Sequence, residues 1–363
     1  MHKDFWSEQV ALHKKLCFLA PMDWYGDSAY RQSMKHIAPH IYCISEFYSA
    51  DGLVHSKFLG QSVLPHQDIE KPLIIQIFGK NPETFAGAAK IIETYWVAGI
   101  DVNMGCPAKK VVRSWHGSSL IISENTAFDI VKALDEATPL PVSVKTRLSF
   151  DGNQDLIKFA QWLQKAGAKL ITIHGRTAKQ AYTGQADFTN IYELKRNLDI
   201  PVVCNGDVLN FTDGMEKVRD LDGFMIGRCS FGNPWTFIPT PKYQDCFREN
   251  YPQSPLLSLF EMGKKYADPR NFVDNCYQPT LYEMLAAMEF HATQLVATKW
   301  ERKGSLEIRK HLVQYLKSFP DAKEYRKALV TTESIEHTKQ TLEEIRVRFA
   351  SELEKRPGLG EVL

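Results

Sequence analysis

The sequence lacks the features of a membrane protein or a secreted protein. No apolar stretch approaches the roughly 18 residues that a membrane-spanning helix needs. The first six residues lack the long apolar core of a signal peptide. The seven cysteines are scattered without Cys-x-x-Cys spacing, which argues against a disulfide framework or a zinc site. These absences predict a cytoplasmic protein with no membrane partner and no bound metal.

The sequence also lacks a strong overall charge. The formal net charge is +1, which argues against nucleic-acid binding through bulk positive charge. The charge is unevenly distributed, however, because nine Lys or Arg face four Asp or Glu between Lys299 and Lys327. This local excess indicates a polyanionic partner for the C-terminal region, and a solvated helix face is the alternative explanation.

Eight short apolar runs recur along the first two-thirds of the chain. Most are apolar at consecutive positions, which is typical of strands that are covered on both faces. The predicted strands are 17–20, 41–45, 73–78, 99–103, 142–146, 170–174, 202–205 and 223–227. Helix-length segments separate them. One starts at Asn81-Pro82 and has apolar residues at helical spacing as far as Trp96, and another runs from Asp155 to Gly167.

Eight strands that alternate with helices predict a (β/α)8 TIM barrel. The alternative is an open doubly wound sheet, which the absence of a Gly-x-Gly-x-x-Gly motif after the first strand disfavours.

After about residue 240 the pattern changes to helix alone. Segments 281–300, 306–318 and 334–353 have helical period, and Leu342, Ile345 and Phe349 keep one face of the last segment apolar. The proline-rich stretch 239–279 reads as a linker. We predict a barrel domain of residues 1–240 followed by an all-α domain of residues 241–363, in a monomeric chain.

Polar or small residues follow each predicted strand, and in a barrel these strand ends meet at one mouth. The residues are Ala20, Pro21 and Met22; Glu46; Gln76; Asn103 and Cys106; Lys145 and Arg147; His174 and Arg176; Asn205, Gly206 and Asp207; and Gly227 and Arg228. Each of them has an ordinary explanation alone, and Cys106 could be a small packing residue in the turn that Gly105 and Pro107 form. Eight successive strand ends of this kind indicate a binding site.

The chemistry of these strand ends predicts FMN. Gly206 and Gly227 let backbone N–H groups approach a phosphate, and Arg228 adds charged donors. Gln76 offers an amide that can pair with the imide edge of a flavin. Lys145 places a cation near the ring, where charge tunes its reactivity. A plain turn remains the alternative for Asn205-Gly206-Asp207.

Several stretches resemble the tRNA-dihydrouridine synthase family. In the barrel they are Ala20-Pro21-Met22 and segments 102–111, 144–147, 173–177, 203–207 and 225–228; beyond it, segments 308–311 and 315–317 resemble the family's helical tRNA-binding domain. The sequence Gly-Cys-Pro-Ala-Lys-Lys-Val at residues 105–111 is most similar to the bacterial B-type branch of that family. Two departures are Asp23-Trp24-Tyr25, where the family has a small residue and Gly, and Gly117-Ser118-Ser119-Leu120, a mild variant of a Gly-x-Ala-Leu-like run.

The resemblance implies NADPH-driven reduction of the C5=C6 bond of a specific uridine in the D-loop of tRNA, with FMN as the bound cofactor. It implies that a hydride from reduced FMN reaches C6 and that Cys106, as the catalytic residue, protonates C5. The expected FMN contacts are Ala20, Pro21, Met22, Gln76, Lys145, His174, Asn205, Gly206, Asp207, Gly227 and Arg228. The expected substrate contacts are Asn103, Lys109, Arg147, Arg176, Arg309 and Lys310.

Two other functions remain open at this point. One is a flavin barrel reductase of free pyrimidines, which would have no use for a basic helical domain. The other is a catalytically silent tRNA-binding module, which would have no use for an intact Cys106 and Lys145.

Overall fold

The computed structural model describes residues 4–257, 264–317 and 322–356, and the chain divides into two compact units that interleave along the sequence. The first unit comprises Met1–Trp24, Tyr42–Val208 and Gly214–Gly227. The second comprises Tyr25–Ile41, Leu209–Asp213 and Arg228–Leu363. A domain boundary between residues 240 and 241 stays a prediction.

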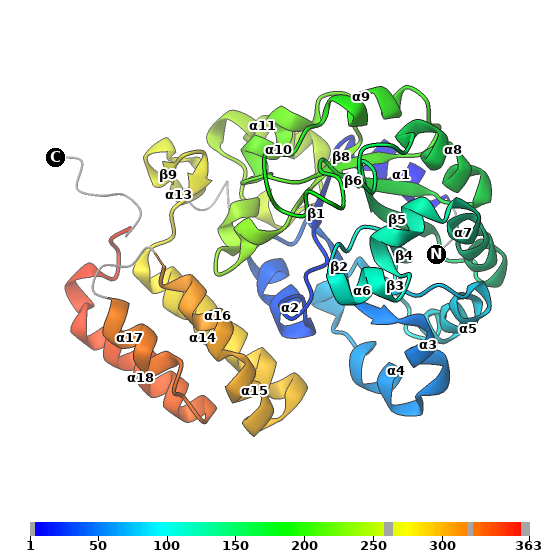
Figure 1. The fold of residues 1–363 in the computed structure, drawn as a ribbon. Coiled ribbons are helices and arrows are strands. Elements are labelled where there is room, and N and C mark those ends of the chain that lie inside the picture. Colours follow the sequence, from blue (N-terminus) through cyan, green and yellow to red (C-terminus); the bar gives the residue numbers. More distant parts are fainter. Residues whose placement is uncertain (1–3, 258–263, 318–321, 357–363) are drawn as a thin grey trace. The chain divides into compact units, whose positions relative to one another are not determined.

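The first unit contains a closed parallel barrel of eight strands, which confirms the predicted fold class (Figure 1). The strands are β1 (Leu16–Leu19), β2 (Tyr42–Ser49), β3 (Leu73–Phe78), β4 (Gly99–Asn103), β5 (Val142–Arg147), β6 (Leu170–His174), β7 (Val202–Asn205) and β8 (Gly223–Ile226). The barrel closes where β1 pairs with β8, with Leu16 opposite Gly223.

Four of the predicted strands, β3, β4, β6 and β7, match the observed bounds residue for residue. The prediction for β2 was too short, because it ended the strand at Ser45 and the structure continues it to Ser49. The pairing of β2 with β3 shifts register between Ile44 and Phe47. Glu46 lies at this irregularity, so a polar residue in a bulged strand was taken for the end of the strand.

The start and stop signals of two helices act as the sequence predicts. Asn81 caps α5 (Pro82–Glu93) by accepting a 3.1 Å hydrogen bond from the Glu83 amide. Gly167 ends α8 (Leu156–Ala166) with a left-handed φ of 117°. Trp96, however, does not continue α5. It lies beyond the helix end with a φ of 56° and is 82% exposed, so its helical spacing was coincidental.

The remaining helices between Phe5 and Val218 are α1 (Phe5–His13), α2 (Ser28–Ile37), α3 (Ala50–His55), α4 (Lys57–Val63), α6 (Lys109–Arg113), α7 (Glu124–Ala137), α9 (Thr189–Lys195) and α10 (Phe211–Val218). Helix α1 precedes the barrel and contributes Trp6, whose ring centroid lies 5.6 Å from that of Phe18 and 5.8 Å from that of Tyr42. These rings belong to an apolar cluster that includes Ile74 of β3 and Leu170 of β6. Because side chains alternate along a strand, Gln76, two residues beyond Ile74, lies on the same face of β3.

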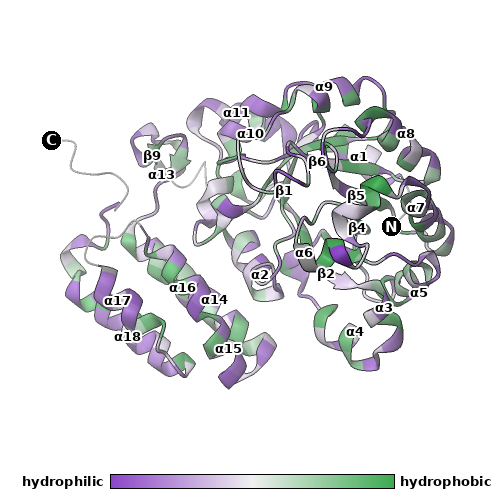
Figure 2. Ribbon diagram, viewed as in Figure 1, coloured by the Kyte–Doolittle hydropathy of each residue, from purple (hydrophilic) through white to green (hydrophobic). Residues whose placement is uncertain are grey.

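The second unit is mostly helical. Its later elements are α11 (Pro241–Asn250), α13 (Lys264–Ala267), a hairpin of β9 (Phe272–Val273) and β10 (Cys276–Tyr277), α14 (Leu281–Lys299), α15 (Glu301–Glu307), α16 (Arg309–Tyr315), α17 (Ala322–Leu329) and α18 (Ile335–Arg348). Helices α17 and α18 carry both hydrophilic and hydrophobic residues along their length (Figure 2). Of the described helices, none combines the length and the apolar character that crossing a bilayer requires.

Two features of this unit differ from the prediction. The predicted helix 306–318 is divided, since α15 ends at Glu307 and α16 begins at Arg309. The predicted linker 239–279 contains α11 and the hairpin. Pro241 is at the start of α11, where a proline costs no hydrogen bond, so a helix start was taken for a linker.

A buried ion pair joins distant segments of the second unit. Asp27 caps α2 by accepting a 3.0 Å hydrogen bond from the Tyr30 amide, and its other oxygen lies 2.9 Å from Lys299 Nζ of α14. Lys299 also pairs with Glu307. Burial pushes the pKa of Asp27 upward, but Lys299 and the nearby histidines outweigh it and hold that pKa at about 2. Lys299, one of the nine basic residues counted above, is therefore already paired.

Two buried histidines lie next to this ion pair. The rings of His291 and His311 are 4.5 Å apart, and the ring of Tyr30 stacks on that of His311 at 5.5 Å. Burial lowers the pKa of His291 to about 4, Asp27 opposes this shift, and the positive charges of Lys310 and Lys299 add to it. Both histidines are therefore neutral in the folded protein at neutral pH.

We predict that acid destabilises the second unit before Asp27 titrates. The folded pKa of His291 is depressed to about 4, so its stabilisation is present above pH 6.5 and is lost as the pH falls toward 4. The free energy of unfolding should fall by roughly 3 kcal/mol across this window. Urea unfolding at a series of pH values measures it. His311, whose pKa burial also lowers well below its usual value, contributes in the same direction, so His291→Gln should make the dependence shallower without abolishing it. An equally steep dependence in that variant would contradict the assignment.

Candidate active site

Register in the barrel brings the polar strand ends of the first unit to one rim. Asn103 is opposite Lys145, Arg147 is opposite His174, and His174 is opposite Asn205. Each of these side chains is at the carboxyl end of its strand, so neighbouring strands place them side by side. The structure therefore brings together the polar residues that the sequence predicted on β4 to β7.

Asn103 holds the loop that carries Cys106. Its Oδ1 accepts hydrogen bonds from the amides of Gly105, at 3.2 Å, and Cys106, at 3.0 Å. On the other side of the loop, the Ser118 amide donates to the Cys106 carbonyl at 3.2 Å. Gly117 has a φ of 60°, and a Cβ added to it would lie 2.9 Å from that carbonyl oxygen. Glycine is thus required at residue 117, and the backbone of Cys106 is held from two sides.

The Cys106 thiol keeps its proton at neutral pH. Burial raises its pKa, and the negative charge of Asp23 raises it further. The Ala108 amide and the cations Arg147 and Lys145 act in the opposite direction without reversing the shift. A thiol in this state can act as a proton donor, whereas a nucleophilic cysteine needs a lowered pKa.

Lys145 reaches from β5 to β7 through its side chain. Its Nζ donates to Asn205 Oδ1 at 2.9 Å, and Asn205 Nδ2 donates to the Met225 carbonyl at 2.9 Å. Burial lowers the pKa of Lys145 to about 8, the positive charge of Arg147 lowers it further, and the negative charge of Asp101 opposes the shift. The ammonium group is therefore still mostly charged at neutral pH.

Gln76 is completely buried, and both ends of its amide have protein partners. Its Nε2 donates to Asp101 Oδ2 at 2.7 Å, and its Oε1 accepts from Asn103 Nδ2 at 2.8 Å. Ser143 Oγ donates to the second oxygen of Asp101 at 2.6 Å. The Gln76 amide can form one more hydrogen bond through its nitrogen and one more through its oxygen. A flavin contact from Gln76 stays a prediction.

Two buried arginines use most of their donors within the protein. Arg147 donates to the carbonyls of Gly105, Thr177 and Ala181 at 2.7 to 3.0 Å. Arg176 donates to the carbonyls of residues 183 and 184 and forms an ion pair with Asp207. These contacts tie the end of β5 to the loops after β4 and β6, and the loop after β6 to the loop after β7. Direct substrate contacts from the two arginines stay a prediction.

The loop after β7 packs against His174. Arg176 Nη1 lies 3.2 Å from His174 Nε2, and because arginine only donates, this nitrogen accepts and the ring proton is on Nδ1. Gly206 has a φ of 109°, and a Cβ there would lie 2.8 Å from His174 Cδ2. The backbone and this neighbour account for Gly206 whether or not a phosphate binds there.

Gly227 is different, because no close contact or backbone conformation among the described residues requires a glycine there. A Cβ added to it would meet Ala20 Cβ at 3.6 Å and Met22 Sδ at 3.8 Å, which are ordinary contact distances. Its backbone does not have a positive φ. A ligand contact with the backbone of Gly227 stays a prediction.

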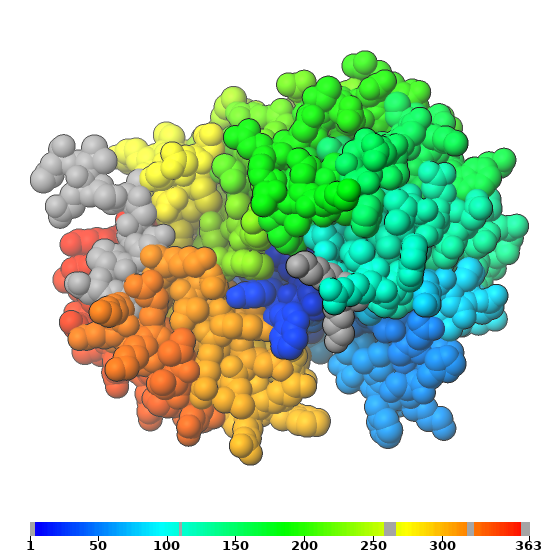
Figure 3. Space-filling view, in the orientation of Figure 1, coloured from blue at the N-terminus to red at the C-terminus, as the bar shows by residue number. Residues whose placement is uncertain are grey.

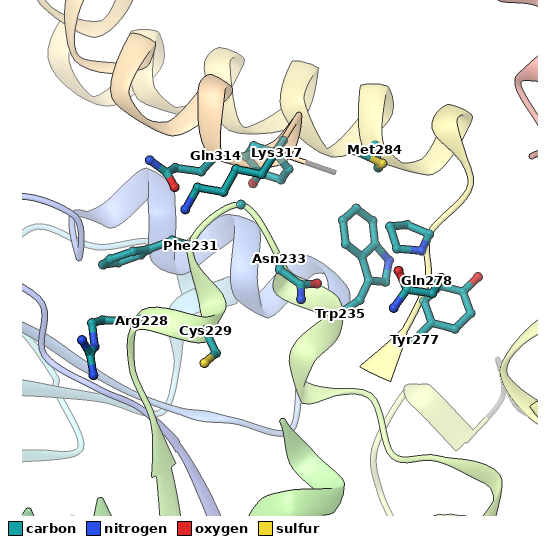
Figure 4. A pocket seen from close by; sticks show the side chains of 13 residues that line it. Arg228, Cys229, Phe231, Asn233, Trp235, Tyr277, Gln278, Met284, Gln314 and Lys317 are labelled. Carbon is teal, nitrogen blue, oxygen red and sulfur yellow. The ribbon is translucent and has the colours of Figure 1, made fainter. Parts of the chain in front are cut away.

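Of the other predicted contacts, Pro21 is half-buried in the first unit, whereas Arg228, Arg309 and Lys310 belong to the second unit. Arg228 is exposed at the edge of a cavity of about 280 Å³ whose lining includes Phe231, Trp235 and Lys317 (Figure 4). Arg309 donates through Nε to the Thr332 carbonyl at 2.7 Å, and Lys310 Nζ lies 5.5 Å from the Tyr25 ring centroid. The side chain of Lys109 lies outside the described part of the chain.

The sequence analysis missed Asp101, Ser143 and Tyr182. A charged residue inside the apolar run 99–103 was the available signal for Asp101. Tyr182 is on the loop after β6, is 58% exposed, and its ring centroid is 5.7 Å from the Arg147 guanidinium carbon. In the space-filling view this loop, in bright green, and the teal residues after β4 are on the same face (Figure 3).

Comparison with known proteins relates the sequence to one family. The family model described as dihydrouridine synthase matches residues 18–352. A probable tRNA-dihydrouridine synthase 1 from Synechocystis sp. is 32% identical over 341 residues, covering 92% of this chain and 87% of that protein. The tRNA-dihydrouridine synthase B of Pseudomonas aeruginosa is 30% identical over 315 residues, covering 85% of this chain and 86% of that protein. A solved old yellow enzyme homologue from Zymomonas mobilis is similar at a TM-score of 0.45 and 12% identity over 67% of this chain and 94% of that chain, which supports no conclusion.

We predict that the Cys106 thiol resists alkylation more than an ordinary cysteine. Because burial raises its pKa, the reaction with iodoacetamide should reach its half-maximal rate at a higher pH than it does in the urea-unfolded chain. Mass spectrometry of the peptide that contains Cys106 separates this thiol from the other six. A midpoint at or below that of the unfolded chain would contradict a protonated thiol.

Proposed function

The chain belongs to the dihydrouridine synthase family, and from that membership we propose that it is a tRNA-dihydrouridine synthase. The proposed reaction reduces the C5=C6 bond of a specific uridine in the D-loop of tRNA. The observation that supports it best is the protonated Cys106 thiol, held on the barrel rim by Asn103 and near the cation of Lys145. A proton donor and a cation at one rim suit a reaction that adds a hydride and a proton across a double bond.

FMN is the proposed bound cofactor, and the residues of the rim fit it. Gly227 presents its backbone without a side chain next to Ala20 and Met22, which suits a backbone contact with the phosphate of FMN. Lys145 would supply a cation to the electron-rich ring, and Gln76 has one unused hydrogen-bonding position at each end of its amide. Pro21, His174, Asn205, Gly206, Asp207 and Arg228 complete the proposed set of contacts. When bound, reduced FMN supplies the hydride that adds to C6, and NADPH is the proposed reductant.

Cys106 completes the reduction by giving its thiol proton to C5 of the uracil. The step breaks the S–H bond, forms a C–H bond and leaves a thiolate. Lys145 and Arg147 lower the pKa of this thiol, so their positive charges stabilise the thiolate that forms. Asn103 keeps the loop in place through the two amides that it accepts.

The substrate uracil must leave its stack in the folded tRNA to reach this rim, at a cost of a few kcal/mol. Contacts with phosphates from the basic residues of the second unit offset such a cost. Arg309 and Lys310 of α16 are the proposed contacts there, with Lys109, Arg147 and Arg176 on the barrel. We also propose a monomeric, cytoplasmic enzyme, with residues 1–240 as the catalytic domain and residues 241–363 as the tRNA-binding domain.

The proposal predicts that the purified protein is yellow, with one FMN per chain, and that it converts uridine to dihydrouridine in unmodified tRNA when NADPH is supplied. Mass spectrometry of nuclease fragments identifies the product and its position. Free uracil and orotate serve as controls and should not react. Reduction of the free pyrimidines without tRNA would favour the flavin reductase alternative, and tRNA binding without NADPH oxidation would favour the silent module.

Cys106→Ala should retain FMN and tRNA binding but lose product formation by about 100-fold or more, because a positioned general acid contributes about that much. Single-turnover formation of dihydrouridine measures the effect, and the flavin absorbance spectrum shows that the cofactor is retained. Cys106→Ser serves as the conservative comparison. A rate for Cys106→Ala within about threefold of wild type would exclude the proposed acid.

A further inference from the structure

We propose that Asp101 is a positioning residue: through Gln76 and Asn103 it fixes the orientation of the loop that carries Cys106, and its carboxylate attracts the ammonium group of Lys145, which lies two residues beyond Ser143 on the same face of β5. This inference rests on the proposed function for its effect on turnover. Its effect on Cys106 can be measured in the protein alone.

The first link runs from Asp101 to Gln76. Asp101 is completely buried on β4, and its two carboxylate oxygens accept hydrogen bonds from Ser143 Oγ and Gln76 Nε2 at 2.6 and 2.7 Å. An ionised carboxylate has no hydrogen to donate. The amide of Gln76 must therefore direct its NH₂ group toward Asp101 and its oxygen away.

The second link runs from Gln76 to the backbone of Cys106. Gln76 Oε1 accepts from Asn103 Nδ2 at 2.8 Å, which leaves Asn103 Oδ1 to accept from the amides of Gly105 and Cys106. Reversing either side-chain amide would bring two donors or two acceptors face to face. One acceptor-only group at the buried end thus decides the orientation of every amide up to the cysteine.

The third link is electrostatic and reaches Lys145. Burial and the neighbouring Arg147 lower the pKa of Lys145 to about 8, and the negative charge of Asp101 opposes that shift. In the same way, burial raises the pKa of Asp101 to about 6, while its hydrogen bonds from Ser143 and Gln76 and the charge of Lys145 oppose the rise. Near neutral pH both groups are mostly charged, and each favours the charge of the other.

The sign of the Asp101 shift argues against a role in stability alone. A carboxylate with a raised folded pKa contributes stability that is lost as the pH rises through about 6, so at neutral pH the buried charge costs folding energy. A residue placed to stabilise the barrel would not be ionised there. A charge kept at a cost beside the proposed proton donor fits a role in positioning.

Two substitutions at residue 101 separate orientation from charge. In Asp101→Asn, the new carbonyl can accept from Gln76 while its NH₂ donates to Ser143 Oγ, so the amide orientations survive and only the charge is lost. In Asp101→Leu, the hydrogen-bond acceptor that orients the amides and the negative charge are both lost. Asp222→Asn is the matched control, because Asp222 is another well-buried carboxylate, hydrogen-bonded to the Val202 amide and paired with Lys195 at the opposite ends of the strands.

Two readouts are needed: the pH dependence of single-turnover product formation, and the rate of Cys106 alkylation in the protein without tRNA. For Asp101→Asn we expect the alkaline loss of activity, near pH 8 in the wild type, to move to lower pH, with the plateau rate reduced by less than about fivefold. For Asp101→Leu we expect a plateau rate lower by about tenfold or more, since small misplacements of reacting groups have effects of this size. Its Cys106 alkylation rate should differ by at least about threefold from that of the wild type. Asp222→Asn should leave both readouts within about twofold of the wild type.

An Asp101→Asn profile identical to that of the wild type would remove the electrostatic role. A folded Asp101→Leu variant with wild-type plateau rate and alkylation rate would remove the positioning role. If Asp101→Leu does not fold, the pH profile of Asp101→Asn still decides the electrostatic part. If the wild type reduces no tRNA uridine, the proposed function fails, whereas the alkylation rates still test whether Asp101 orients the Cys106 loop.

Discussion

The candidate site depends on one side chain, the amide of Asn103. Its oxygen holds the backbone of Cys106, and its nitrogen is bound to Gln76, which in turn is bound to a buried carboxylate. A cysteine on a loop after a strand could take many positions, because loops carry few obligatory contacts. Here the loop is attached to the strand that precedes it and, through that strand, to the interior of the barrel. The rigidity of the barrel is thereby passed to a residue outside any helix or strand.

Burial sets the charge states around this contact. It raises the pKa of the Cys106 thiol and of Asp101 and lowers that of Lys145, so every shift is toward the neutral form. These shifts leave the three groups in different charge states at neutral pH, because a thiol, a lysine and a carboxylate start from different ordinary pKa values. A thiol moved upward stays protonated, while a lysine moved to about 8 and a carboxylate moved to about 6 remain mostly charged at neutral pH. One environment thus produces a proton donor beside a pair of opposite charges.

The sequence predicted the barrel well because a strand that is buried on both faces leaves a continuous apolar run with a polar end, as in segments 170–174 and 202–205. It also predicted which residues lie on the rim, since strand ends in a parallel barrel share one side. It could not predict the bond between Gln76 and Asp101 or between Lys145 and Asn205, because those partners are set by register between strands. Nor could it show that Arg147 is committed to three carbonyls, which depends on loop conformation.

The pairing of Asp27 with Lys299 joins residues 272 positions apart in the sequence within one compact unit. During synthesis, helix α2 is made long before α14, so the second unit cannot close until nearly the whole chain has left the ribosome. A fragment that begins after the barrel would also expose the surface of α14 that α2 covers and leave Lys299 without its buried carboxylate. Cutting the chain in two at one point therefore cannot yield both units whole, and the helical part is complete only as long as the segment Tyr25–Ile41 remains attached.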